Sequence, residues 1–544
     1  MATTIGAVRA SGRQGFYRFA SDHRDRTALI IPGGATMTFG CLLDRVNALS
    51  HGLRGLGLTR GDVVAAAVRN GFEYIELFLA TAQVGMYFVP IDWRLGHRET
   101  FHIVHDSDAT VLIAEAERVA GWSADALPDR LFVCGGTVEG WRPYESLIAD
   151  QPVCSPEDRS AGSLIGYTAG ITGRLKGVKW YLPSTRPEQV ITRHLMPVFA
   201  AYGAEVGRGV HLVCSPLYHS APGAFAIGLL HFGHTLVIQS SFDAEAFLRD
   251  VDRYRVTSSH MVPTHFHRLL RLADVACAEY DLASLEFLIH GSAPCPILIK
   301  QKMLDWLGPI VWEYFGCNEG WVSRISPHEW VGRPGSVGKA LPDLTVAIVD
   351  DAGDIMPPGM PGTIYFGSDE HRPVFEYQND PDRTAAGRLG NLVTGGDYGY
   401  VSEDGYIYLL DRHADVIVSG DVRIYPAEIE QYLMLHPAVS DAAVVAIPDA
   451  IPGRRVLAVI QLSTTSGPSW VVEKELHEYC DDALAATKRP ERFGFLTDFP
   501  RTDTGKLRRN KIREIFADVQ FMTSVPLEGR EYSGHGMSWP DGKY

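Results

Sequence analysis

The chain has 544 residues, of which 46% are hydrophobic and 21% are charged, and its formal net charge is -15. Several ordinary domains fit within this length, and the near-average composition excludes a largely disordered chain. Because the negative charge repels phosphate groups, nucleic acid and anionic lipid surfaces are not expected as partners.

Cysteine usage and hydropathy bear on the compartment of the protein. The eight cysteines include no CxxC pair and no dense disulfide framework, which favours a reducing environment. Residues 1–13 lack the apolar core of a signal peptide, and no later stretch reaches the ~18 consecutive apolar residues that a membrane span needs. We therefore predict a cytoplasmic protein without a membrane span.

Short apolar runs alternate with longer amphipathic stretches in two parts of the chain, residues 27–115 and residues 163–315. This alternation is typical of β-α-β units and predicts mostly parallel sheets covered by helices. The predicted strands are residues 28–31, 63–68, 111–114, 210–214, 235–239 and 287–290, and the predicted helices are residues 42–56, 72–84, 244–254 and 296–307. The two parts together predict two α/β layers.

The pattern changes near residue 335. Glycine and proline punctuate residues 335–410, which predicts short antiparallel strands in a β-rich subdomain. A small α+β pattern begins after residue 412. We therefore predict an α/β fold with a large N-terminal domain (residues 1–412), a small mobile C-terminal domain (residues 413–519) and a loosely held tail rich in Gly, Ser and Pro (residues 520–544).

A glycine-rich segment follows a predicted strand at residues 167–177, where the sequence reads YTAGITGRLKG. Glycines let backbone N–H groups approach phosphate, hydroxyls add donors, and a lysine adds a point charge. The pattern GxxxxGK[ST] is not satisfied, so the segment is not a P-loop, and on this segment alone a flexible surface loop stays open as the alternative. The candidate phosphate-binding residues are Thr168, Gly170, Thr172, Gly173 and Lys176.

Together with motifs further along the chain, this segment resembles the phosphate loop of the adenylate-forming superfamily, which includes acyl-CoA synthetases, nonribosomal-peptide adenylation domains and luciferases. The usual loop of the superfamily reads roughly YTSGTTGxPKG. Ala169, Ile171 and Leu175 replace its serine, second threonine and proline, so two hydroxyl groups are lost. The resemblance extends from about residue 39 to residue 513 and keeps the order of the motifs.

The sequence predicts different roles for His219 and for the group of His260, His265 and His267. Residues 216–219 read PLYH and resemble the PxxH motif of the superfamily, which implies that His219 lies near the bound carboxylate. Without that context, a histidine in an apolar stretch is more often a satisfied core residue. His260, His265 and His267 match no standard zinc spacing, and we predict no metal site there.

Further motifs imply an adenosine site. Residues 291–294 read GSAP and resemble the GGAP turn of the superfamily, whose backbone lies flat against adenine. Residues 314–320 read YFGCNEG and resemble YGxTE, and residues 394–397 read TGGD, one residue longer than the common TGD form. The resemblance assigns adenosine binding to Gly291, Ser292, Ala293, Pro294, Tyr314, Asp397 and Arg412. In this assignment Tyr314 stacks on adenine and Asp397 accepts hydrogen bonds from the ribose.

The resemblance also implies the phosphate, metal and catalytic groups. Asn318 stands where the superfamily usually has threonine, and its amide can still donate to the α-phosphate. Glu319 is predicted to bind Mg²⁺ through a hard carboxylate oxygen. Residues 500–506 read PRTDTGK and resemble PRTxTGK, so Lys506 is predicted to stabilise the adenylation transition state. The predicted catalytic residues are thus Lys506, Glu319 and His219.

Two motifs of the C-terminal domain depart from the superfamily pattern. Residues 411–415 read DRHAD, which places Ala414 at the domain hinge, where the superfamily often has Asp or Lys. Residues 419–430 read SGDVRIYPAEIE and resemble SGGxxIxPxEIE, with Asp421 in place of the second glycine. In the superfamily this thioesterification loop, here at Gly420 and Asp421, lines the channel for pantetheine.

The resemblance implies ATP-dependent activation of a carboxylic acid to an acyl-adenylate, with ATP, Mg²⁺ and, as a second substrate, CoA. One alternative is a stand-alone adenylating enzyme that delivers its adenylate to a separate acyl-accepting or CoA-ligating protein, as Asp421 suggests. Another is a catalytically silent nucleotide-binding relative, suggested by the altered phosphate loop. Small residues between positions 220 and 226 leave room for a fatty or otherwise bulky acid, and the sequence leaves open whether the chain forms a homodimer.

Overall fold

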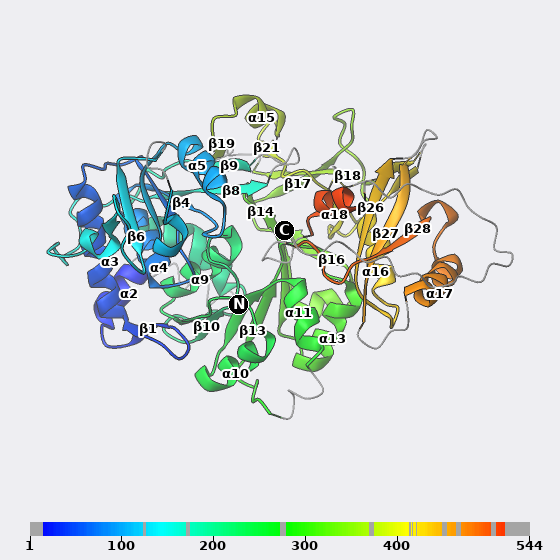
Figure 1. Cartoon of the computed structure of the whole chain (residues 1–544), viewed down its shortest axis with the longest axis horizontal. Helices are drawn as coiled ribbons and strands as arrows, with labels where there is room; N and C mark the ends of the chain where they lie inside the picture. Colours follow the sequence, from blue (N-terminus) through cyan, green and yellow to red (C-terminus); the bar gives the residue numbers. More distant parts are fainter. Residues whose placement is uncertain are drawn as a thin grey trace.

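The computed structural model describes residues 15–122, 127–169, 175–272, 279–368, 375–412, 415, 417–419, 422–448, 454–463, 469–501 and 507–516. Within these ranges, a large N-terminal part is built on two sheets, and a smaller C-terminal part is built on a three-stranded sheet. Figure 1 shows the C-terminal strands and helices, coloured yellow to red, gathered at one end of the molecule. The predicted fold class is confirmed.

The larger sheet joins the second α/β part of the chain to the β-rich segment. Its strands, in spatial order, are β2 (Thr36–Thr38), β1 (Thr27–Ile30), β11 (Thr235–Ile238), β10 (Val210–Val213), β12 (Ser258–Met261), β13 (Phe287–His290), β14 (Val311–Cys317), β15 (Gly320–Ile325), β16 (Ser336–Ala340), β23 (Ile407–Arg412), β22 (Asp397–Val401), β18 (Gly362–Gly367), β21 (Leu392–Val393) and β20 (Arg388–Leu389), with β17 (Thr345–Val349) paired to β18. Neighbours from β1 to β14 are parallel, whereas β14, β15, β16 and β23 pair antiparallel.

The second sheet carries the predicted phosphate segment. Its strands, in spatial order, are β19 (Phe375–Tyr377), β9 (Leu175–Trp180), β8 (Ser163–Ala169), β4 (Tyr87–Pro90), β3 (Val63–Ala67), β5 (Ala109–Glu115), β6 (Arg130–Cys134) and β7 (Arg142–Pro143). Every residue of β3 is buried, as expected for a central strand covered on both faces. The distant strand β19 adds to the edge of this sheet through β9.

Helices fill the space between the two sheets and cover their outer faces. The helices of the N-terminal part are α2 (Phe16–Asp22), α3 (Phe39–Gly55), α4 (Phe72–Val84), α5 (His97–Asp106), α6 (Ala116–Val119), α7 (Pro187–Val190), α8 (Met196–Ala200), α9 (Ser220–His231), α10 (Ala244–Tyr254), α11 (Pro263–Leu270), α13 (Ile297–Leu307), α14 (Pro327–Val331) and α15 (Pro381–Ala386). Residues of α3, α4 and α9 share one hydrophobic core with residues of both sheets. A second core packs α10, α11 and α13 against the larger sheet.

Local chemistry explains where several helices begin. The Thr38 side chain accepts a hydrogen bond from the Cys41 backbone N–H at the start of α3, and the Asp243 side chain accepts one from Ala246 at the start of α10. These side chains satisfy N–H groups that have no partner within the helix. The predicted helices at residues 72–84 and 244–254 coincide with α4 and α10.

The C-terminal part has its own core. Its elements are the hairpin β24 (Ile417–Ser419) and β25 (Val422–Ile424), the sheet β26 (Val439–Pro448), β27 (Arg454–Leu462) and β28 (Arg492–Phe495), and helices α16 (Pro426–Leu433), α17 (Ser469–Ala483) and α18 (Arg509–Ile515). Arg509 of α18 forms an ion pair with Glu430 of α16. A hydrogen bond from Arg271 to the Ser440 hydroxyl at 2.7 Å links this part to the N-terminal part.

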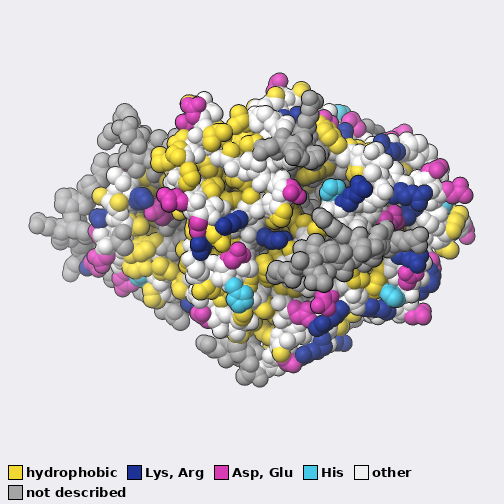
Figure 2. All heavy atoms as spheres, turned by 180° about the vertical axis from the view of Figure 1, so that it is seen from behind, with side chains coloured by type: hydrophobic (Ala, Val, Ile, Leu, Met, Phe, Trp, Pro, Cys, Tyr) yellow, Lys and Arg dark blue, Asp and Glu magenta, His cyan; other side chains and the backbone are white. Residues whose placement is uncertain are grey.

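The surface mixes charges of both signs. Figure 2 shows Lys and Arg side chains interspersed with Asp and Glu over the face opposite to that of Figure 1. Among the described residues, no helix is both long enough and apolar enough to cross a membrane.

Candidate active site

The β14–β15 hairpin presents Asn318 to three other elements. The Asn318 side-chain oxygen accepts from the Ser220 hydroxyl at 2.5 Å, and its amide nitrogen donates to the Gly166 carbonyl at 3.2 Å. The Trp180 indole N–H donates to the Asn318 backbone carbonyl at 2.9 Å. The hairpin tip is therefore held between the start of α9 and the paired strands β8 and β9.

Glu319 lies beside Asn318 and is only 4% exposed. Its Oε1 atom accepts hydrogen bonds from the Lys176 ammonium at 2.8 Å and from the Tyr377 hydroxyl at 2.7 Å. Burial alone would raise the pKa of Glu319, but Lys176 and then Tyr377 outweigh it, so the pKa lies below its ordinary value. Glu319 is thus an ionised carboxylate in a largely water-excluded site.

One member of the predicted phosphate loop, Lys176, contacts this carboxylate. Thr168 of β8 and Lys176 of β9 are paired across the two antiparallel strands. The intervening Gly170, Thr172 and Gly173 lie outside the described residues. The structure therefore brings the ends of the loop and Glu319 together, although 143 residues separate Lys176 from Glu319 in the sequence.

His219 immediately precedes α9 and is the residue before Ser220, which contacts Asn318. The helix that follows is tightly packed at two of its small residues. A Cβ atom on Gly228 would stand 2.0 Å from the Phe199 ring, and one on Gly223 would stand 2.7 Å from a backbone oxygen. Those two positions are small because neighbours fill the space, whereas Ala221 and Ala224 remain partly exposed.

The predicted adenine turn packs directly on Tyr314. Ser292 has a φ of 67°, and a Cβ atom on Gly291 would stand 2.5 Å from the Tyr314 ring, so glycine is required for this approach. The Tyr314 hydroxyl lies 3.1 Å from both the Ser292 hydroxyl and Nε2 of His260. His260 thus contacts the Tyr314 hydroxyl, a contact that the sequence does not predict.

The other two histidines of the group, His265 and His267, have surroundings different from those of His260. The His265 ring stacks on Phe242 at a centroid distance of 3.8 Å, and burial lowers its pKa well below the ordinary value, so it is a neutral core residue. His267 instead lines the cavity described next.

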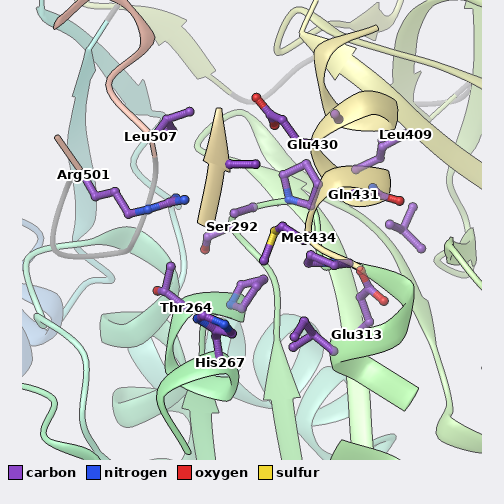
Figure 3. A pocket seen from close by; sticks show the side chains of 18 of the residues that line it. Thr264, His267, Ser292, Glu313, Leu409, Glu430, Gln431, Met434, Arg501 and Leu507 are labelled. Atoms are coloured by element: carbon purple, nitrogen blue, oxygen red, sulfur yellow. The ribbon is translucent and has the colours of Figure 1, made fainter. Parts of the chain in front are cut away.

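A cavity of about 220 Å³ lies between the N-terminal and C-terminal parts. On the N-terminal side it is lined by the predicted adenosine residues Ser292, Ala293, Pro294, Tyr314 and Asp397, together with Phe315. Figure 3 shows Ser292 on one side of the cavity, with Gln431 of α16 on the other. The cavity therefore gathers motifs from several distant parts of the sequence.

Several predicted residues flank the cavity or fall outside the described residues. Asp397 and Arg412 are register partners on β22 and β23, and the Arg412 side chain is not described. Lys506 is also outside the described residues, but Arg501 and Leu507, on either side of its segment, both line the cavity. The predicted hinge and loop residues Ala414, Gly420 and Asp421 are outside the description as well.

Residues that belong to none of the predicted motifs support the predicted groups. Tyr377 and Trp180 hold Glu319 and Asn318, and Phe315 lines the cavity beside Tyr314. Tyr377 stands in the segment EYQNDPDRT, whose Asn, Asp and Pro predict a turn but no contact with Glu319. No local pattern reveals a partner 58 residues away.

Two protein-family models match this chain, and both describe AMP-binding enzymes. The model of the AMP-binding enzyme family matches residues 16–371, and the model of the AMP-binding enzyme C-terminal domain matches residues 428–506. The chain therefore belongs to the AMP-binding enzyme family, which confirms the resemblance to adenylate-forming enzymes.

Three relatives illustrate the range of the family. A feruloyl-CoA synthase from an Amycolatopsis species is 31% identical over 487 residues, covering 89% of this chain and 95% of the relative. The fatty acid–[acyl-carrier-protein] ligase ScoC of Streptomyces coeruleorubidus is 27% identical, covering 92% of this chain and 95% of the relative. The structure of amide bond synthetase McbA from Marinactinospora thermotolerans is 26% identical with a TM-score of 0.77, covering 92% of this chain and 99% of that chain.

Proposed function

We propose that this protein activates a carboxylic acid with ATP, forming an acyl-adenylate and pyrophosphate. The observation that carries this proposal is the meeting of Lys176, Glu319 and Asn318 at one point between the inter-domain cavity and the start of α9. A nucleotide whose base lies in the cavity can present its phosphates to these groups. The family match and the acid-activating relatives support the same reaction.

The nucleotide is held by residues from both sheets. Ser292, Ala293 and Pro294 supply the flat backbone for adenine, the Tyr314 ring supports this turn from its contact with Gly291, and Asp397 accepts hydrogen bonds from the ribose. Arg412 lies beside the ribose as the strand partner of Asp397. The polyphosphate is bound by Thr168, Gly170, Thr172, Gly173 and Lys176.

In the reaction, a carboxylate oxygen of the acid attacks the α-phosphorus of ATP. A new P–O bond forms, the bond to the bridging oxygen breaks, and pyrophosphate leaves with the electron pair. His219 lies beside the entering carboxylate, and Asn318 donates to the α-phosphate. Lys506 places a positive charge where negative charge develops in the transition state.

The residues present fit a magnesium ion. Mg²⁺ is commonly bound by one or two carboxylates together with substrate phosphates, and Glu319 is a buried, ionised carboxylate next to the phosphate segment. When bound, the metal would neutralise charge on the phosphates. Before that, Lys176 neutralises Glu319, and this pairing keeps an isolated charge from being buried.

CoA thioester formation is the second step that we propose, with the C-terminal domain of residues 413–519 turning about Ala414. A second candidate is delivery of the adenylate to another acceptor, which Asp421 favours because a carboxylate in the pantetheine channel hinders a thiol. One relative is named as an acyl-carrier-protein ligase and another as an amide bond synthetase, and these names support acceptors of the acyl group other than CoA. The cytoplasmic location and a homodimeric state stay predictions.

Acid-dependent exchange of pyrophosphate into ATP tests the proposal directly. A panel of aliphatic, aromatic and polycyclic acids is incubated with the enzyme, ATP and Mg²⁺, and exchange is measured for each acid. We expect exchange with at least one class of acid and none without acid. Nucleotide binding without exchange for any acid would instead identify a silent binder.

Replacing Asp421 with glycine is expected to increase acyl-CoA formation by about 10-fold, the effect of lowering the thiol pKa by ~1. Pyrophosphate release should change little, because adenylation precedes entry of the thiol. Hydroxylamine trapping of the adenylate, run beside direct detection of acyl-CoA, measures the two halves separately.

The Asp421→Asn variant is the matched control, because it keeps the size of the side chain and removes its charge. If charge is the obstacle, Asn and Gly raise the thioester rate alike, whereas a steric obstacle is relieved by Gly alone. Rapid acyl-CoA formation by the unmodified protein would contradict the second candidate function.

A further inference from the structure

Tyr377 is the last residue of β19 and its side chain is 7% exposed. Its hydroxyl donates to Oε1 of Glu319 at 2.7 Å, and the same oxygen accepts from the Lys176 ammonium at 2.8 Å. Two donors of different kinds therefore share one carboxylate oxygen.

The two donors also contact each other. The Lys176 ammonium lies 4.9 Å from the centroid of the Tyr377 ring, within the range of a cation–π interaction. Tyr377 is fixed by β19, whose backbone pairs with β9, the strand that carries Lys176. Tyr377 thus belongs to a short, anchored strand, whereas Lys176 has a long flexible side chain that can change partners.

We propose that Tyr377 is a positioning residue that holds the Glu319 carboxylate in place while Lys176 exchanges Glu319 for phosphate. This inference rests on the proposed function. When the nucleotide enters, Lys176 would turn to its phosphates, and Glu319 would then be available to hold the metal cation. A cation would stay beside the carboxylate throughout this exchange, and the tyrosine hydrogen bond is the contact that persists.

The physical need for such a contact follows from burial. Glu319 is 4% exposed, so water cannot readily replace the ammonium when Lys176 departs. A buried charge without a hydrogen-bonding partner is costly, and a side chain free to rotate meets a metal in the wrong geometry. The Tyr377 hydroxyl supplies both a partner and a fixed orientation during the exchange.

The Tyr377→Phe variant tests this role, because it removes only the hydroxyl and keeps the ring that packs against Phe375 and Lys176. We expect the Mg²⁺ concentration needed for half-maximal ATP binding to rise about 10-fold, the low end of the effect of losing a hydrogen-bonding partner of a metal ligand. Binding is measured calorimetrically without acid, so that the result does not depend on catalysis. The KM for the acid should not change.

Tyr17→Phe is the matched control. The Tyr17 hydroxyl donates to the Leu79 carbonyl at 2.8 Å and the residue is also 7% exposed, so the variant loses an equally buried hydrogen bond away from the site. Its Mg²⁺ dependence should match that of the unmodified protein. Thermal unfolding of both variants shows that each is folded.

The outcomes separate this inference from the proposed function. An unchanged Mg²⁺ dependence in Tyr377→Phe, with normal pyrophosphate exchange, overturns the role of Tyr377 and leaves adenylation standing. An equal shift in Tyr17→Phe also overturns it, because a general loss of stability then explains the result. Absence of acid-dependent exchange in the unmodified protein contradicts the proposed function itself.

Discussion

Replacing Lys506 with alanine is expected to reduce acyl-adenylate formation by about 10²–10³-fold, the usual effect of losing one preorganised group that stabilises transition-state charge. ATP binding should weaken little, because Lys506 is expected to act on charge that develops only during the reaction. Arg501 and Leu507, which flank its segment, line the cavity and support this placement. Pyrophosphate release and ATP binding, measured side by side, check both expectations.

Lys488→Ala is a suitable control for this variant. Lys488 belongs to the same part of the chain and pairs with Glu428 at 2.8 Å, so its removal changes the net charge equally without touching the cavity lining. We expect near-normal pyrophosphate release from Lys488→Ala. Near-normal release from Lys506→Ala would show that the assignment is wrong.

Replacing Glu319 with glutamine is expected to raise the Mg²⁺ requirement of adenylation by about 10–100-fold, because a neutral amide is a poorer ligand for a hard cation. The amide oxygen can still accept from Tyr377 and Lys176, so we expect the local fold to persist. A magnesium titration of pyrophosphate release measures the effect, and an unchanged titration would count against a metal-binding role.

Glu76→Gln provides the comparison for Glu319→Gln. Glu76 is fully buried and forms an ion pair with Arg45 at 2.6 Å, so both variants neutralise a buried glutamate that is paired with a cation. Breaking such a pair is destabilising in either case. Only Glu319→Gln should alter the Mg²⁺ titration, while Glu76→Gln should lower the thermal unfolding midpoint and leave the titration unchanged.

The β-rich segment of residues 335–410 is not separate from the larger sheet. Its glycine and proline pattern predicted a subdomain, yet β16 pairs with β15 on one side and with β23 on the other. The segment is therefore hydrogen-bonded into the larger sheet. A strand's composition shows that it needs neighbours, but not which strands become those neighbours.

The sequence by itself determined the family, the α/β class and the order of the motifs. These features are local: alternating apolar runs predict strands and helices, and short motifs such as GSAP or PRTDTGK keep their residue types together. The structure shows the predicted bounds for the helices at residues 72–84 and 244–254, and each helix ends before a residue in the left-handed region, Gly85 or Arg255.

Only the tertiary structure decided how the site is supported. Lys176 and Tyr377 reach Glu319 across 143 and 58 residues, and His260 reaches Tyr314 across 54. The room expected beyond His219 is partly filled, since the Leu217 backbone oxygen occupies the space beside Gly223. Such contacts depend on how strands pair and how side chains fill the core. These arrangements join residues far apart in the chain and leave no periodic or local signal in the sequence.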